Sequence, residues 1–142
     1  MLRRAHFMVV LLWSGIVYAE AVPAIDGYSP VSYFTVGTPE KGSEQFSVEY
    51  GGKTYFLTNA EQVDLFKQNP DKYRPRYETC PYSLTLGQQK PLDPTNFQIL
   101  GGYLLLFHKS DMMDGLAAFK ESGLSEAQLI ERADKQYVLL RF

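Results

Sequence analysis

A small set of soft donor side chains decides what chemistry this sequence offers. Its single cysteine, Cys80, lies in the stretch YETCPYSLTLG, and the soft donors beyond the apolar N-terminus are His108, Met112 and Met113. Thiolate, imidazole and thioether groups are ligands that suit Cu(I). The residue types therefore predict a metal site made by Cys80, His108 and Met112, with Cu(I) as the metal.

The same residues have other interpretations, which the sequence leaves open. A lone cysteine cannot form an internal disulfide, so Cys80 is a metal ligand, a redox thiol or a small buried hydrophobe. His108 is expected at a strand end, where histidine is often a hydrogen-bonded surface residue, and Met112 and Met113 could fill a core. The shortage of histidine excludes a His₂Cys copper centre and argues against four-ligand zinc.

Aromatic side chains offer a second kind of site. Tyr77 and Tyr82 flank Cys80, and we predict that they bind a ligand or cofactor through a pocket lined by aromatic rings. The alternative is that these rings build the core of a small domain. The set comprises Tyr28, Tyr33, Phe34, Tyr50, Tyr55, Phe56, Tyr73, Tyr77, Tyr82 and Tyr103.

Signatures of catalysis and of nucleic-acid binding are missing. The sequence has no HExxH pair, no GxSxG elbow and no Gly-rich phosphate loop, so we predict a non-enzymatic protein. With 14 Lys and Arg against 16 Asp and Glu, the net charge is −2, which gives nucleic acid nothing to hold.

The N-terminus is typical of a secretory signal peptide. Arg3 and Arg4 precede an apolar run over 7–17, and small residues follow at Ala19 and Ala21. The run is shorter than the roughly 20 residues of a membrane-spanning helix. We expect residues 1–21 to be removed and the rest to be periplasmic or secreted, without stable membrane insertion. Its partners would then be a metal ion or a protein of the export compartment.

Two Gly-Gly dipeptides predict two β-hairpins. In the first, over 44–58, Phe46, Val48 and Tyr50 alternate onto one face before the turn. In the second, over 97–108, the return strand is apolar on both faces and is expected to be covered. We expect the hairpins to form a small antiparallel sheet.

Capping residues place the helices between and after these hairpins. Ser29 before Pro30 predicts a short helical turn through Tyr33 and Phe34, and Asn59 caps a central helix that Pro70 ends.

Beyond Tyr73 the sequence lacks periodicity up to Leu92, so this stretch, which holds Cys80, is expected to be a loop. The tail predicts two helices, the first opened by Ser110 or Asp111 and closed by Gly123, the second capped by Ser125 with Leu129, Ile130 and Ala133 inward. The fold class is α+β.

The order of these motifs resembles the YHS domain family. The resemblance rests on GGKTYFLTNAEQVDLFKQNPDKY over 51–73, flanked by IDGYSPVSYF over 25–34 and by the cysteine-bearing stretch up to residue 110. It implies a small exported module over 22–110, with 111–142 as a helical extension packed on the same domain.

The resemblance also implies a function. YHS domains are generally taken to bind heavy metals, and the metallated members carry two cysteines at positions that fall here on Thr58 and Gln62. A metal site would therefore have to use Cys80 instead. The first expectation is a copper-binding or copper-handling module; the alternatives are a metal-free binding module for a small molecule or protein, and a thiol redox protein.

Overall fold

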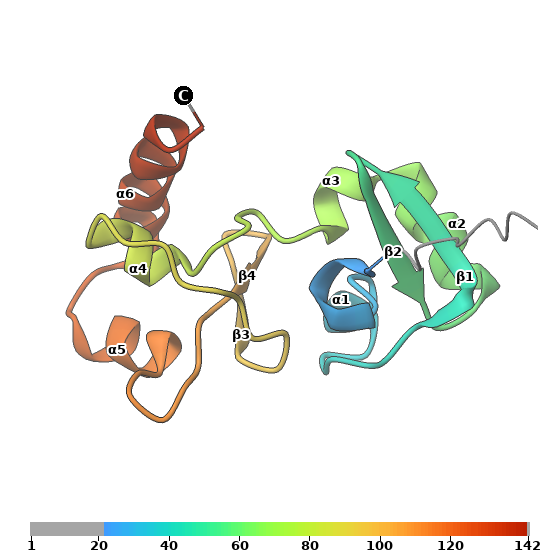
Figure 1. Cartoon of the computed structure of the whole chain (residues 1–142), viewed down its shortest axis with the longest axis horizontal. Helices are drawn as coiled ribbons and strands as arrows, with labels where there is room; N and C mark the ends of the chain where they lie inside the picture. The colour runs from blue at the N-terminus through green and yellow to red at the C-terminus, as the bar shows by residue number, and fades with distance from the viewer. Residues whose placement is uncertain (1–21, 142) are drawn as a thin grey trace, which may run out of the picture.

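The computed structural model describes residues 22–141, so the predicted signal peptide lies outside the described residues. The fold is α+β, as predicted, with six α-helices and two small antiparallel sheets in the described part. Figure 1 shows two lobes, the first carrying the elements from η1 (Ala24–Gly27) to α3 (Pro70–Tyr73) and the second carrying those from α4 (Pro81–Thr85) to α6 (Glu126–Leu139), so the chain passes between them after α3. Within residues 22–141 no helix has the length and apolar character needed to cross a membrane.

The first predicted hairpin is confirmed and forms the sheet of the first lobe. Strands β1 (Ser43–Tyr50) and β2 (Lys53–Leu57) pair antiparallel with Tyr50 opposite Lys53. Gly51 and Gly52 make the turn with φ of +59° and +76°, values that a side chain rarely adopts.

Two helices follow this hairpin where one was expected. Helix α2 (Ala60–Gln68) is capped by Asn59, whose side chain accepts a hydrogen bond from the Gln62 N–H. Pro70 ends α2 as predicted, but it also opens the short helix α3 (Pro70–Tyr73), because proline is favoured at the first helical position.

The predicted turn through Tyr33 and Phe34 is present as α1 (Ser32–Thr35), but the predicted cap is wrong. The hydroxyl of Ser29 donates instead to Gln62 Oε1 at 2.6 Å, and α1 has no side-chain cap. The Ser29 hydroxyl is therefore bonded to Gln62, a residue of α2 that is distant in the sequence, and is not used to cap α1.

The second predicted hairpin is also confirmed, but it forms a sheet of its own. Strands β3 (Phe97–Leu100) and β4 (Tyr103–Leu106) pair antiparallel with each other and not with the first hairpin, so the two hairpins do not join into one sheet. The return strand is covered as expected, with Leu104 and Leu105 fully buried.

The helices of the second lobe differ from expectation in two places. The stretch expected to be a loop contains helix α4 (Pro81–Thr85), and α5 (Gly115–Glu121) begins at the cap Asp114 rather than at Ser110 or Asp111. Helix α6 (Glu126–Leu139) has the predicted Ser125 cap, completed by Gln128 as a capping box.

The described residues form three apolar clusters, one of which joins the two lobes. One lies inside the first lobe around Phe66, and one inside the second lobe around Leu105 and Leu129. The third joins the lobes, because Tyr33 of α1 packs there against Leu104 and Leu106 of β4. Burying this apolar surface from both lobes favours a fixed arrangement of the two.

Candidate functional site

A pocket of about 290 Å³ lies where the two lobes meet. Its walls come from the N-terminal turn, from β2, from the crossing segment between the lobes (residues 74–78), from the stretch 91–94 and from the end of α6, which are far apart in the sequence. The lining residues are Ala24, Ile25, Asp26, Lys53, Tyr55, Arg74, Pro75, Arg76, Tyr77, Glu78, Pro91, Leu92, Pro94, Tyr137 and Arg141. Such a concave site between structural units is a common place for a small-molecule ligand.

One wall of the pocket is a strained backbone turn. Ile25 and Asp26, in the short 3-10 element η1 (Ala24–Gly27), have φ of 48° and 55°. This left-handed conformation is unusual for an L-residue and a genuine outlier for a β-branched one. Lys41 Nζ holds the turn through the Asp26 carbonyl at 2.6 Å. Strain of this kind tends to occur at ligand-binding positions.

The opposite wall is organised by a hydrogen-bonded network around Tyr77. The Tyr77 hydroxyl donates to Asp134 Oδ1 at 2.7 Å, and Arg76 binds the same carboxylate through Nε at 3.1 Å and a terminal nitrogen at 2.8 Å. Burial, together with this hydrogen bond, raises the pKa of Tyr77. The hydrogen bond to Asp134 raises the pKa of Arg76 in turn. The network fixes α6 to the crossing segment.

Tyr55 brings a hydroxyl to the pocket from the core of the first lobe. Its ring packs on Phe66 with centroids 4.9 Å apart, and only 5 % of the residue is exposed. Among residues 22–141 its hydroxyl has no hydrogen-bond partner. Burial raises its pKa, against the effect of nearby Arg74. The phenol is therefore available to a ligand as a neutral donor.

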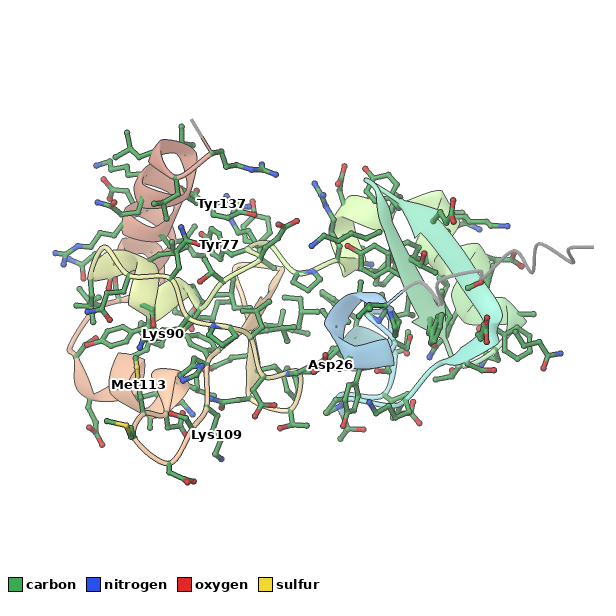
Figure 2. All side chains as sticks on the ribbon, viewed as in Figure 1. Asp26, Tyr77, Lys90, Lys109, Met113 and Tyr137 are labelled. Atoms are coloured by element: carbon green, nitrogen blue, oxygen red, sulfur yellow. The ribbon has the colours of Figure 1, made fainter. Side chains whose placement is uncertain are left out.

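Tyr137 and Arg141 close the pocket from the end of α6. The Tyr137 ring meets Tyr77 edge to face at 5.5 Å, and the Arg141 guanidinium lies 5.0 Å from the Tyr137 ring centroid. Figure 2 shows Tyr77 and Tyr137 close together, with Asp26 on the side of the other lobe. An adjoining hollow of about 220 Å³ shares Glu78, Tyr137 and Arg141 with the pocket.

Of the two tyrosines predicted to bind a ligand, one lines the pocket. Tyr77 is 2 % exposed and takes part in the wall just described. Tyr82 lies on α4, partly buried against the core of the second lobe, and is not a lining residue.

Cys80 lies in the apolar core of the second lobe. The residue is fully buried, its thiol is free, and its backbone N–H donates to the Lys90 carbonyl at 3.0 Å. A Cβ added at Gly115 would come within 2.7 Å of the Cys80 sulfur. The sulfur thus fills the space that the missing side chain of Gly115 leaves.

The other predicted metal ligands are not gathered into a donor set around Cys80. The backbone of His108 is close to Gly115, but the ring Nδ1 is hydrogen-bonded to the Pro91 carbonyl at 2.9 Å. Met112 is 97 % exposed. Within residues 22–141 no three His, Cys, Asp or Glu side chains lie close enough to share an ion. The described arrangement therefore has no preformed set of these donors around Cys80.

Copper binding through Cys80 stays a prediction that solution experiments can test. Anaerobic titration with Cu(I) should show stoichiometric binding that Cys80→Ser abolishes if the thiol is the ligand. Weak binding that survives this change would contradict it. Redox chemistry of the same thiol also stays a prediction, and it requires access that the buried position restricts.

The two positions at which the family resemblance places thiols are occupied by a polar contact. Gln62 Oε1 accepts hydrogen bonds from the Thr58 N–H at 3.1 Å and from the Ser29 hydroxyl at 2.6 Å. Gln62 is 5 % exposed, so its amide ties Thr58 after β2 and Ser29 ahead of α1 to α2 inside the lobe.

Most lining residues could not be identified from sequence patterns. The Arg74-Pro75-Arg76 tripeptide is a local signal, because proline holds the chain extended between two cations. Tyr137 and Arg141 carry no comparable signal, since they reach the pocket from the end of a helix more than fifty residues further along the chain.

Comparison with models of protein families, with curated proteins and with solved structures finds no match to this chain. The function is therefore inferred from the chemistry of the chain's own residues.

Proposed function

We propose that the protein is a non-enzymatic binding module for a small organic molecule, which occupies the pocket between the two lobes. The observation that carries this proposal is the pocket itself, with its three tyrosines and four cationic side chains. Its volume of about 290 Å³ is at the lower end of the range for ligand sites and corresponds to roughly ten water-sized groups. A compact, ring-sized ligand fits this space.

The composition of the walls supports a ligand with both apolar and polar parts. Prolines 75, 91 and 94 and Leu92 offer apolar surface, while the Tyr55 hydroxyl and the arginines offer donors. Ordinary ligand sites combine these features, a mostly apolar lining with a few placed polar groups. The strained turn at Ile25 also supports a site at this position, because the fold maintains it there at an energetic cost.

A fragment screen by NMR tests the proposal. Neutral, anionic and cationic ring compounds are titrated into ¹⁵N-labelled protein, and the amide shifts are mapped onto the chain. We expect shifts to concentrate at residues 24–26, 53–55, 74–78 and 137–141. A matched control is Tyr77→Phe against Tyr82→Phe, since only the first changes the pocket wall. A screen in which no compound perturbs these amides would contradict the proposal.

A further inference from the structure

Charged side chains of both signs line the interlobe pocket. Four cationic side chains, Lys53, Arg74, Arg76 and Arg141, face two carboxylates, Asp26 and Glu78. Asp71 and Asp134 pair with Arg74 and Arg76, so most of the positive charge of the lining is compensated. The cationic donors that these pairs leave free are therefore the groups that can select a ligand.

Three of the four cations pair with neighbouring carboxylates, and in two of them the pair occupies the donors that could meet a ligand. Lys53 pairs with Glu78 at 2.8 Å, and Arg76 is engaged by Asp134 through two nitrogens. The Arg76 guanidinium also lies 3.8 Å from the Tyr103 ring centroid, which holds its plane in place. These two cations therefore form the wall of the pocket and contribute little net charge to a ligand.

Arg74 and Arg141 retain N–H groups that can bind a ligand. Arg74 uses Nε for Asp71 at 2.8 Å, which leaves its terminal nitrogens, and Arg141 contacts the Tyr137 ring with its guanidinium. One comes from the crossing segment and the other from the end of α6. Arginine binds planar anions such as carboxylates through parallel N–H donors.

The buried phenol of Tyr55 adds a neutral donor to the same pocket. The residue is 5 % exposed, and its hydroxyl is not one of the fully buried polar atoms left without a partner in the described part of the chain. Because Tyr55 lines the pocket, this hydroxyl can donate a hydrogen bond to a ligand oxygen there. Around it lie the Tyr77 and Tyr137 rings and the proline surfaces, which suit a flat apolar body.

We infer that the ligand of this pocket is a small aromatic carboxylate. Its carboxylate is bound by Arg74, Arg141 and the Tyr55 hydroxyl, and its ring lies against Tyr77 and Tyr137. This inference rests on the proposed function, because it names the class of ligand for the same pocket.

Matched ligand pairs test the inference separately from the pocket. Phenylacetate and its neutral isostere phenylacetamide are titrated by calorimetry and by NMR at low salt. We expect phenylacetate to bind at least tenfold more tightly, with the preference falling as salt is raised, because salt screens charge attraction. Arg141→Gln and Arg74→Gln should each remove most of this preference. Arg132→Gln is the matched control, since Arg132 is an exposed arginine of α6 outside the pocket.

The possible results separate the two claims. Equal binding of acid and amide in the pocket would overturn the anion preference and leave the binding module intact. Binding of neutral fragments alone would also overturn the anion preference and leave the binding module intact. If no compound perturbs the pocket amides, both claims fail. A preference that persists in both Arg74→Gln and Arg141→Gln would overturn the assignment of these arginines.

Tyr55→Phe provides a second readout that does not depend on charge. Removing the hydroxyl while keeping the ring should weaken phenylacetate binding by about fivefold to tenfold, the usual effect of one hydrogen bond. Because the hydroxyl has no partner among the described residues, stability without ligand should change little. Unchanged affinity would overturn the role of Tyr55.

Discussion

Single residues in this protein are held in positions that their type does not favour. Ile25 has a left-handed backbone although it is β-branched, and Gly115 has no side chain because the Cys80 sulfur occupies that space. The packed fold keeps Ile25 in a backbone conformation that isoleucine disfavours, and it leaves no room for a side chain at residue 115. Each position therefore gives a substitution whose effect on stability is unusual.

At residue 25 we expect a glycine variant to be more stable than an alanine variant, which is the reverse of their usual order. Both substitutions remove the Ile25 side chain, but only glycine relieves the left-handed strain, which costs about 1 to 2 kcal/mol for an L-residue. Ile25→Gly should therefore be more stable than Ile25→Ala by about 1 kcal/mol. Urea unfolding followed by circular dichroism measures the difference. A less stable glycine variant would show that the turn is not left-handed in solution.

At residue 115 we expect a substitution whose cost depends on Cys80. Gly115→Ala would place a Cβ 2.7 Å from the Cys80 sulfur, so it should lower the free energy of unfolding by about 1 to 3 kcal/mol. In a Cys80→Ala background the sulfur is absent, and the same change should cost at least about 1 kcal/mol less. A double-mutant cycle from urea unfolding measures this coupling, and strict additivity would contradict the contact.

At the scale of elements, α6 is attached to the rest of the molecule by two different kinds of contact. Its buried face packs Leu129 and Ala133 into the core of the second lobe, and its Asp134 receives hydrogen bonds from Arg76 and Tyr77. The crossing segment is fixed in turn to β4, because the Arg76 N–H donates to the Leu104 carbonyl at 3.0 Å. Through Arg76, the Asp134 carboxylate thus links α6 to β4.

Asp134 should make stability depend on pH in the acid range. Burial raises its pKa, but the hydrogen bonds from Arg76 and Tyr77 outweigh this and hold the pKa below its usual range. A lowered folded-state pKa contributes stability above the unfolded value of about 3.9, and this stability is lost as pH falls through the folded value. Asp134→Asn should therefore destabilise the protein at pH 7 and make the loss of stability below about pH 4 shallower.

The expected loss for Asp134→Asn at pH 7 is about 1 kcal/mol, because the carboxylate is partly exposed and solvent weakens the ion pair. Urea unfolding at several pH values measures both effects. Glu131→Gln is the control, since Glu131 forms an exposed pair with Lys135 on the same helix, and it should have the smaller effect. An equal effect of the two changes would show that the Asp134 network does not anchor α6.

At the scale of the whole molecule, two contiguous lobes are fixed against each other by the contact between α1 and the second hairpin. Tyr33 is 1 % exposed, meets Phe97 with centroids 4.8 Å apart, and donates its hydroxyl to the buried Pro94 carbonyl at 2.7 Å. This contact lies beside the pocket, because Pro94 is also a lining residue. The geometry of the pocket therefore depends on how the lobes are held.

Tyr33→Phe should loosen the contact between the lobes. The buried Pro94 carbonyl loses its donor, which should lower the free energy of unfolding by about 1 to 2 kcal/mol. Burial also raises the pKa of Tyr33, so its contribution is fully present below the unfolded value of about 10 and is lost as pH rises above it. The variant should therefore lose less stability than the wild type in alkaline solution.

Urea unfolding at pH 7 and in alkaline solution measures both effects of Tyr33→Phe. Tyr82→Phe, whose hydroxyl has no hydrogen-bond partner among residues 22–141, serves as the control and should change stability little. A Tyr33→Phe variant as stable as the control would indicate that this hydrogen bond does not fix the lobes.

Local signals predicted much of this fold, and the missing parts depend on distant contacts. Both hairpins follow from Gly-Gly turns between apolar runs, and the Asn59 and Ser125 caps follow from side chains that bond within three residues. Helix α4 was missed because it has only five residues. The pocket was predicted only as an aromatic pocket near Tyr77, because its other walls come from segments that only the packed lobes bring together.

The left-handed turn at Ile25 and Asp26 also bears on how this chain would evolve under selection. A library selected for thermal resistance alone should accumulate glycine at these two positions, since glycine adopts this backbone without strain. A library selected for ligand binding should retain side chains there, because they form part of the pocket wall. Sequencing both selected pools would show whether stability or binding maintains the turn.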